Sequence, residues 1–223
     1  MTSRTIRVDS VELTINASPE LAEEAVHVAE MEPGRHLVTL RFSGARSGDD
    51  WVALSWNEPL GDATGFWHPA AVWNRSLRAP WTSRLTTSAI HSAPVSCLFG
   101  ADGRSRATFA LSETMRPVEI TAGVEEHGDR FGFHIGAPAV DREVCLLLDH
   151  RRLPYERCLA DVVRWWESLG GMAPAPVPAL ARTPAYSTWY SMGKAVTAAE
   201  VERLLTFSVR LVPLAWKTPE TPA

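Results

Sequence analysis

Apolar residues recur at every second position through the first two thirds of this chain. Half-buried antiparallel strands show this period because successive side chains point to opposite faces of a sheet. The pattern therefore predicts many short strands up to about residue 150, arranged as a β-sandwich or barrel. The alternating sets are Val11, Leu13 and Ile15; Val38, Leu40 and Phe42; Val52, Leu54 and Trp56; Val118, Ile120, Ala122 and Val124; and Phe131, Phe133 and Ile135.

Turn signals separate these strands. Asp102-Gly103 is typical of a β-hairpin, and His127-Gly128-Asp129 lies between two alternating runs. The segment from Pro19 to Glu30 is expected to be a short helix or a surface insertion. Trp56 shares the face of Val52 and Leu54, so we expect it in the core.

The period changes between Glu156 and Leu169. Apolar residues there recur on one helical face, and Gly170-Gly171 ends the run. This predicts one amphipathic helix after the strands. The helical face consists of Leu159, Val162, Val163, Trp166 and Leu169.

Alternating prolines follow the predicted helix and indicate an extended, semi-rigid connector. Beyond it, Ala185 to Tyr190 forms a short aromatic strand signal, and Thr197 with Glu200 has the spacing of a helix capping box. Together they predict one βα unit, whereas a closed parallel barrel needs eight units and about 250 residues. We therefore predict a β domain at 1–170, a linker at 171–184, and a truncated barrel stub with a frayed tail at 185–223.

Composition excludes several classes of function. The 223 residues are 45% hydrophobic, enough for one substantial core, and the net charge is −4 with dispersed arginines, which disfavours nucleic-acid binding. No apolar run approaches the length of a membrane span, so we expect a cytoplasmic protein. Cys97, Cys145 and Cys158 lack paired spacing and are expected to be buried small hydrophobes rather than disulfide or zinc residues.

Motifs for metal or cofactor chemistry are not found in the sequence. The seven histidines lack ligand spacing, and there is no glycine-rich phosphate loop or nucleophile elbow, so neither a metal nor a cofactor is expected. Glycoside hydrolysis normally uses two carboxyl groups that flank the scissile bond, and no convincing pair is present. Glu125 and Glu126 should point to opposite faces, while Asp149 lies beside Arg151 and is expected to form an ion pair.

The run Tyr186-Ser-Thr-Trp-Tyr-Ser191 after the proline-rich segment resembles the barrel entry of the α-galactosidase-like glycoside hydrolases of family 36. Upstream segments follow the order and approximate spacing of that family's N-terminal domain. These segments are Trp67-His-Pro69, Ala93-Pro-Val95, Arg106 to Ser112, Gly123 to Glu126, Leu148-Asp149 through Leu153-Pro-Tyr155, and Asp161 to Trp166.

The resemblance implies a galactose-mutarotase-like antiparallel β-supersandwich, closed by one helix and followed by an incomplete barrel stub. It also implies a non-catalytic N-terminal module, inactive alone, because both catalytic aspartates of the family lie on later barrel strands, beyond the last residue here. The chain departs from the family after Ser191, where Met192-Gly-Lys194 follows. The acidic barrel strand expected later is also replaced, as a frameshift or truncation would cause.

Four aromatic residues are candidate sugar contacts. The resemblance implies that Trp189, with Tyr190, lines the sugar pocket of an intact enzyme, and Trp67 and Trp73 lie near loop-forming residues. The expected partners are an α-galactoside-type carbohydrate, and a barrel chain or a second copy of this chain. Two alternatives stay open: a stand-alone carbohydrate-binding or interaction module, and half of a split glycosidase that a separate barrel chain completes.

Overall fold

The computed structural model of the chain divides into two units, Met1–Ala173 and Pro174–Ala223. Each unit is described by itself. The structure describes residues 2–18, 21–43, 47–69, 82–88, 92–125, 128–170, 175–182 and 192–215.

The described residues of the first unit form twelve strands and one helix. Helix α1 (Tyr155–Ser168) follows the last strand. The strands are β1 (Thr2–Val8), β2 (Val11–Ala17), β3 (Leu21–Glu32), β4 (Arg35–Phe42), β5 (Trp51–Pro59), β6 (Ala63–Trp67), β7 (Thr82–Thr87), β8 (Val95–Gly100), β9 (Ser105–Leu111), β10 (Val118–Glu125), β11 (Arg130–Pro138) and β12 (Glu143–Asp149).

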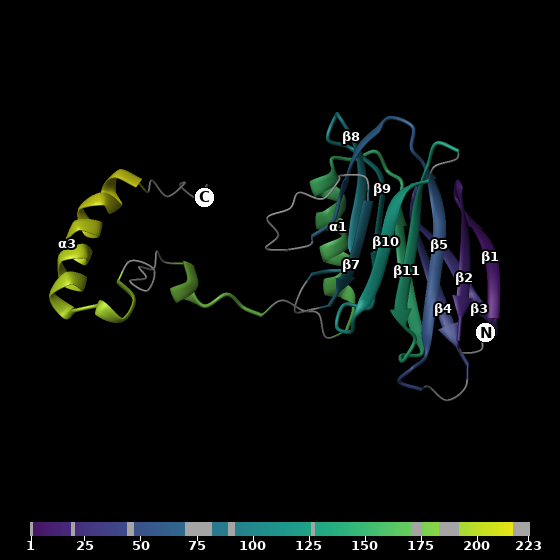
Figure 1. Cartoon of the computed structure of the whole chain (residues 1–223), viewed down its shortest axis with the longest axis horizontal. Helices are drawn as coiled ribbons and strands as arrows, with labels where there is room; N and C mark the ends of the chain where they lie inside the picture. Colours follow the sequence, from purple (N-terminus) through teal and green to yellow (C-terminus); the bar gives the residue numbers. More distant parts are fainter. Residues whose placement is uncertain are drawn as a thin grey trace, which may run out of the picture. The chain divides into compact units, whose positions relative to one another are not determined.

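The strands form two antiparallel sheets of six. Sheet 1 has the order β1-β2-β5-β11-β10-β7, and sheet 2 has the order β3-β4-β12-β9-β8-β6. Figure 1 shows sheet 1 toward the reader, with sheet 2 and α1 behind it. The first unit is therefore mainly β and sandwich-like.

The main core lies between the two sheets and contains the predicted alternating residues, with the exception of Val124, which is 42% exposed. Trp56 is buried there, which confirms its predicted place. Its indole stacks on the Phe133 ring at a centroid distance of 5.0 Å and meets the Phe109 ring edge-on at 5.1 Å. These aromatic contacts join β5, β9 and β11 across the sandwich.

A second core lies between sheet 2 and α1. Strand β12 is apolar on both faces: Leu146 and Leu148 point into the sandwich, while Cys145 and Leu147 join Val162 and other residues of the second core. The indole nitrogen of Trp166 donates a hydrogen bond to the Leu111 carbonyl at 2.8 Å. The predicted helix is confirmed, but its face toward sheet 2 includes Trp165 and excludes Val163, which is 47% exposed.

The prediction of a helix or insertion from Pro19 to Glu30 is wrong, because Leu21–Glu32 forms the end strand β3 of sheet 2. Its alanines and glutamates favour a helix locally, but the neighbouring strand β4 offers a ladder of backbone partners. The ladder is irregular between Leu21 and Val26. Tertiary pairing thus overrides the local preference.

The predicted turns are found where the structure describes them. Asp102-Gly103 joins β8 to β9, with Gly103 at a φ of +70°. Gly128 and Asp129 join β10 to β11, both at positive φ. The left-handed region of backbone conformation favours glycine, so Gly103 and Gly128 explain why the sequence predicts turns at these two places.

The second unit contains a helix and two short 3₁₀ turns among its described residues. The turns are Ala179–Arg182 and Gly193–Ala195, and the helix is α3 (Ala198–Ala215). The Glu200 amide donates to the Thr197 hydroxyl at 3.4 Å, which confirms the predicted capping box. The predicted strand at 185–190 lies outside the described residues, and no described residue of this unit is in a strand.

Within the described ranges, neither α1 nor any other helix combines the length and apolar character that a membrane span requires.

Candidate functional site

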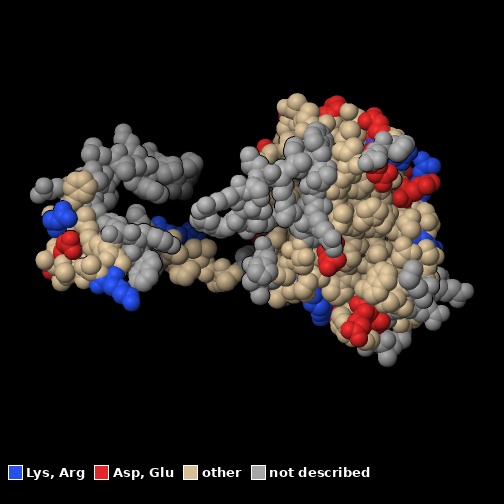
Figure 2. Space-filling view, viewed as in Figure 1, with Lys and Arg blue, Asp and Glu red and all other residues tan. Residues whose placement is uncertain are grey.

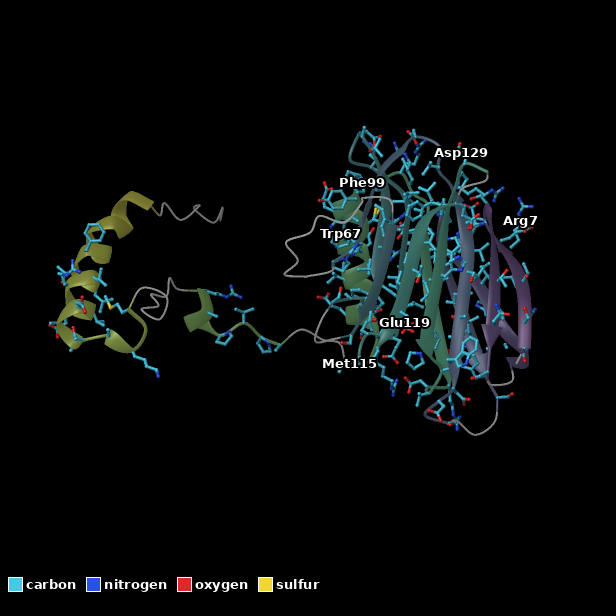
Figure 3. The ribbon with its side chains drawn as sticks, in the orientation of Figure 1. Arg7, Trp67, Phe99, Met115, Glu119 and Asp129 are labelled. Atoms are coloured by element: carbon cyan, nitrogen blue, oxygen red, sulfur yellow. The ribbon has the colours of Figure 1, made fainter. Side chains whose placement is uncertain are left out.

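The structure describes one of the four aromatic candidates. Trp67 is half-buried at the end of β6, where its ring centroid lies 6.5 Å from that of Tyr155 at the start of α1. The Phe99 ring lies 5.9 Å from the same tyrosine, so three aromatic residues meet on this side of the sandwich (Figure 3). Trp73, Trp189 and Tyr190 lie outside the described residues.

The expected ion pair at Asp149 is confirmed. The Asp149 carboxylate is 1% exposed, and its Oδ2 atom accepts a hydrogen bond from the Arg151 guanidinium at 2.6 Å. The same guanidinium donates to Asp161 of α1 at 2.7 Å and also pairs with Glu32 of β3. Arg151 with these three carboxylates, here called the Arg151 cluster, ties α1 to sheet 2.

A broad groove of about 1120 Å³ lies beside the Arg151 cluster. Partial burial works against the charged form of Asp161, but Arg151, with Arg164 and Arg35 nearby, holds the pKa of this carboxyl below its ordinary value. The carboxylates of the cluster are therefore neutralised by arginine. This arrangement holds the fold together rather than presenting a reactive acid.

A second cluster contains a histidine and two carboxylates at one end of the sandwich. His150 Nε2 lies 2.9 Å from Oε1 of Glu58, which is only 3% exposed. The Trp56 indole donates to the same oxygen at 3.0 Å. The other ring nitrogen of His150 lies 3.4 Å from the Asp9 carboxylate, without hydrogen-bond geometry. Glu58, His150 and Asp9 are called the His150 cluster below.

Local sequence places Glu58 in this cluster. It continues the inward positions of β5 after Leu54 and Trp56, so its carboxylate enters the sandwich. An acidic residue at an inward position needs a partner, because an unpaired buried charge is costly. The buried pair Glu58 and His150 was not predicted, although the inward register of Glu58 indicates a buried carboxylate. The partner His150 comes from the end of β12 and is not predictable from spacing.

A depression of about 340 Å³ borders the His150 cluster and includes Asp62, Arg106 and Arg152 in its lining. Arg106 forms a two-pronged hydrogen bond with Asp62, at 2.6 and 2.7 Å, and this guanidinium holds the Asp62 pKa below its ordinary value. As in the Arg151 cluster, the acidic and basic side chains that line this depression are paired with each other.

The environment of His150 favours its protonated form. Burial lowers the pKa of the imidazole, but the hydrogen bond to Glu58 and the charges of Glu58, Asp9 and Asp149 outweigh it, so the pKa is raised above its ordinary value of about 6.5. The cluster therefore binds a proton more readily than a free imidazole does.

Stability is expected to depend on pH through this histidine. Since its pKa is higher in the folded than in the unfolded chain, its contribution is fully present below about pH 6.5 and is lost as the pH rises through the folded pKa. Urea unfolding at several pH values should show a falling free energy over this range. The decline should flatten in His150→Gln and persist in His27→Gln, since His27 is exposed on β3. An unchanged slope in His150→Gln would contradict this assignment.

The three cysteines are buried and unpaired, as predicted. Burial raises the pKa of the Cys97 thiol above its ordinary value and raises those of Cys145 and Cys158 to about 11. At neutral pH these groups are thiols rather than nucleophilic thiolates. Among the described residues, no group of three or more potential ligand side chains is placed to hold a metal ion.

No protein-family model, curated protein or solved structure matches this chain. The described part of the chain offers the Arg151 and His150 clusters, an aromatic corner at Trp67, and a polar outer face on sheet 1.

Proposed function

We propose that this chain is a non-catalytic N-terminal module of an α-galactosidase-like glycoside hydrolase. The observation that carries the proposal is the order of its elements. Twelve strands in two facing sheets come first, then α1 on the outer face of sheet 2, and then a separate unit that begins in the proline-rich stretch. This is the order that the resemblance to family 36 implies.

The finer architecture is part of the proposal. The sandwich is a galactose-mutarotase-like supersandwich over 1–170, and 171–184 is the linker. Residues 185–223 are the opening stub of a catalytic barrel and its tail. The module is cytoplasmic, and in an intact relative it packs against the barrel and supports oligomer contacts.

The proposed sugar contacts are aromatic residues, and Trp67 is the one that the structure describes. Trp67 lies at the end of β6, half-buried beside Tyr155 at the start of α1. Trp73, Trp189 and Tyr190 are proposed as further sugar contacts, and the resemblance implies that Trp189 helps to line the pocket of an intact enzyme. Aromatic faces suit this task because they pack on the C–H face of a sugar.

The ion clusters support a non-catalytic role. A glycosidase needs two carboxyl groups facing each other across room for a sugar. Asp149 and Asp161 instead converge on one guanidinium, and the buried Glu58 is held by His150 and Trp56. Carboxylates held in this way stabilise the packing of the sheets and the helix.

Incubation with an aryl α-galactoside tests the proposal. We expect the purified chain to release aryl alcohol no faster than buffer, while an intact α-galactosidase at the same concentration turns the substrate over. Steady turnover that follows the concentration of this chain, and that survives a second purification step, would contradict the proposal.

A stand-alone carbohydrate-binding module is the second candidate. It is favoured by a specific observation, the depression among polar side chains on the outer face of sheet 1. Binding without cleavage would be its activity.

A further inference from the structure

The outer face of sheet 1 is polar and largely uncharged at its centre. Sheet 2 carries α1 on its outer side, whereas the outward positions of β2, β5, β10 and β11 alternate with the core residues of sheet 1. In Figure 2 the part of this face that is not grey is mostly uncharged in its middle, with acidic and basic residues toward its rim. In Figure 3, Glu119 and Arg7 are labelled at two ends of it.

Hydrogen-bonding side chains line up across the strands. In register, Thr5 of β1 opposes Thr14 of β2, which opposes Ser55 of β5, then His134 of β11 and Thr121 of β10. The hydroxyl oxygens of Thr5 and Thr14 lie 3.4 Å apart, and His134 Nδ1 lies 3.1 Å from the Ser55 hydroxyl. The row therefore presents hydroxyls and an imidazole at adjacent positions on five neighbouring strands of sheet 1.

A depression of about 470 Å³ opens beside the middle of this row, with Thr14, Ser55 and His134 in its lining. Asn57 donates to the Glu125 carboxylate at 3.3 Å above Gly132. A Cβ at Gly132 would lie 2.9 Å from the Glu125 carboxylate and 3.2 Å from the Asn57 amide oxygen, so the glycine makes room for this pair. The volume is within the range of small-ligand sites.

The lining combines donors and acceptors without excess charge. Two arginines, Arg7 and Arg130, are matched by two glutamates, Glu12 and Glu125. Hydroxyl, amide, imidazole, carboxylate and guanidinium groups are thus all present. A neutral ligand whose own hydroxyls both donate and accept suits such a lining better than a polyanion does.

An exposed indole lies farther along the same strand face. Trp51 is 39% exposed and shares its side of β5 with Ser55, about 13 Å away at the usual rise per residue. The small residues Ala53 and Gly136, opposite each other in register, lie between them. An oligosaccharide can therefore cross the small residues and pack on the indole, whereas a single sugar is too short.

We propose that the outer face of sheet 1 binds a neutral oligosaccharide along β5, from the depression at Asn57 and His134 to Trp51. The position follows from the residues of the sheet, and the choice of a sugar rests on the proposed function. Hydroxyls of the ligand exchange hydrogen bonds with Ser55, Asn57 and His134, and the Trp51 ring takes an apolar sugar face.

Isothermal titration calorimetry of the full chain tests this site, with raffinose, stachyose and cellotriose as probes. We expect at least one probe to bind, and His134→Ala to weaken its binding about tenfold or more. His27→Ala is the matched control, since His27 is exposed on sheet 2. Ala53→Arg, which removes no contact but fills the path along β5, should abolish binding.

The outcomes separate the two proposals. Weaker binding in His134→Ala and loss of binding in Ala53→Arg, with thermal unfolding unchanged and His27→Ala like the parent chain, support the site. Binding by none of the probes, or binding that both variants leave intact, overturns it. Neither result depends on hydrolysis, so the aryl α-galactoside assay judges the proposed function independently.

Discussion

Replacing Phe133 with alanine is expected to lower the free energy of unfolding by about 3 to 5 kcal/mol. The ring is 1% exposed and lies 5.0 Å from Trp56, 5.1 Å from Phe109 and 5.1 Å from Phe131. Its loss leaves a cavity that rigid aromatic neighbours on both sheets fill poorly. Since domains of this size are stable by about 5 to 15 kcal/mol, the change is large. Urea unfolding followed by tryptophan fluorescence measures it.

A substitution on the same sheet provides the control. Val124 on β10 is 42% exposed, so Val124→Ala should change the free energy of unfolding by no more than about 0.5 kcal/mol. Equal effects of Phe133→Ala and Val124→Ala would contradict the placement of the aromatic core between the sheets.

Asp149→Ala is expected to cost about 3 to 5 kcal/mol, because it removes a buried partner from the Arg151 guanidinium. Arg151 donates to this carboxylate from its backbone amide and from two guanidinium nitrogens, and its side chain is 13% exposed. The remaining partners, Asp161 and Glu32, come from other elements. Docking of α1 on sheet 2 should therefore weaken, with a lower denaturation midpoint.

Asp141→Ala is the matched control for that variant. Asp141 pairs with Arg116 at 2.7 Å, but its side chain is 62% exposed, so its loss should cost no more than about 1 kcal/mol. If the two aspartate variants were equally stable, the Arg151 cluster would not anchor the helix.

The strands of the sandwich were predictable from the sequence where one face of the strand is buried and the other is exposed. Strands β2, β5, β10 and β11 each place apolar residues inward at every second position, and this pattern alone predicts their conformation. Strand β3 was missed because an end strand has weaker alternation and its alanines and glutamates suit a helix. Its conformation is decided by pairing with β4, which local sequence does not encode.

The polar sites were less predictable than the fold. Asp149 and Arg151 are two residues apart, so their ion pair could be predicted from the sequence. Glu58 and His150 meet only because sheet 1 packs against sheet 2. The row from Thr14 to His134 depends on strand order and register, since these residues come from β2, β5 and β11. Spacing along one chain does not reveal which outward positions become neighbours.

The proposed module hydrolyses no α-galactoside. Proton NMR of raffinose incubated with the purified chain tests this proposal most directly, because intact raffinose and released galactose are seen in one sample. The account predicts that the anomeric signals of raffinose stay intact. Free galactose that accumulates in proportion to the protein concentration would contradict it.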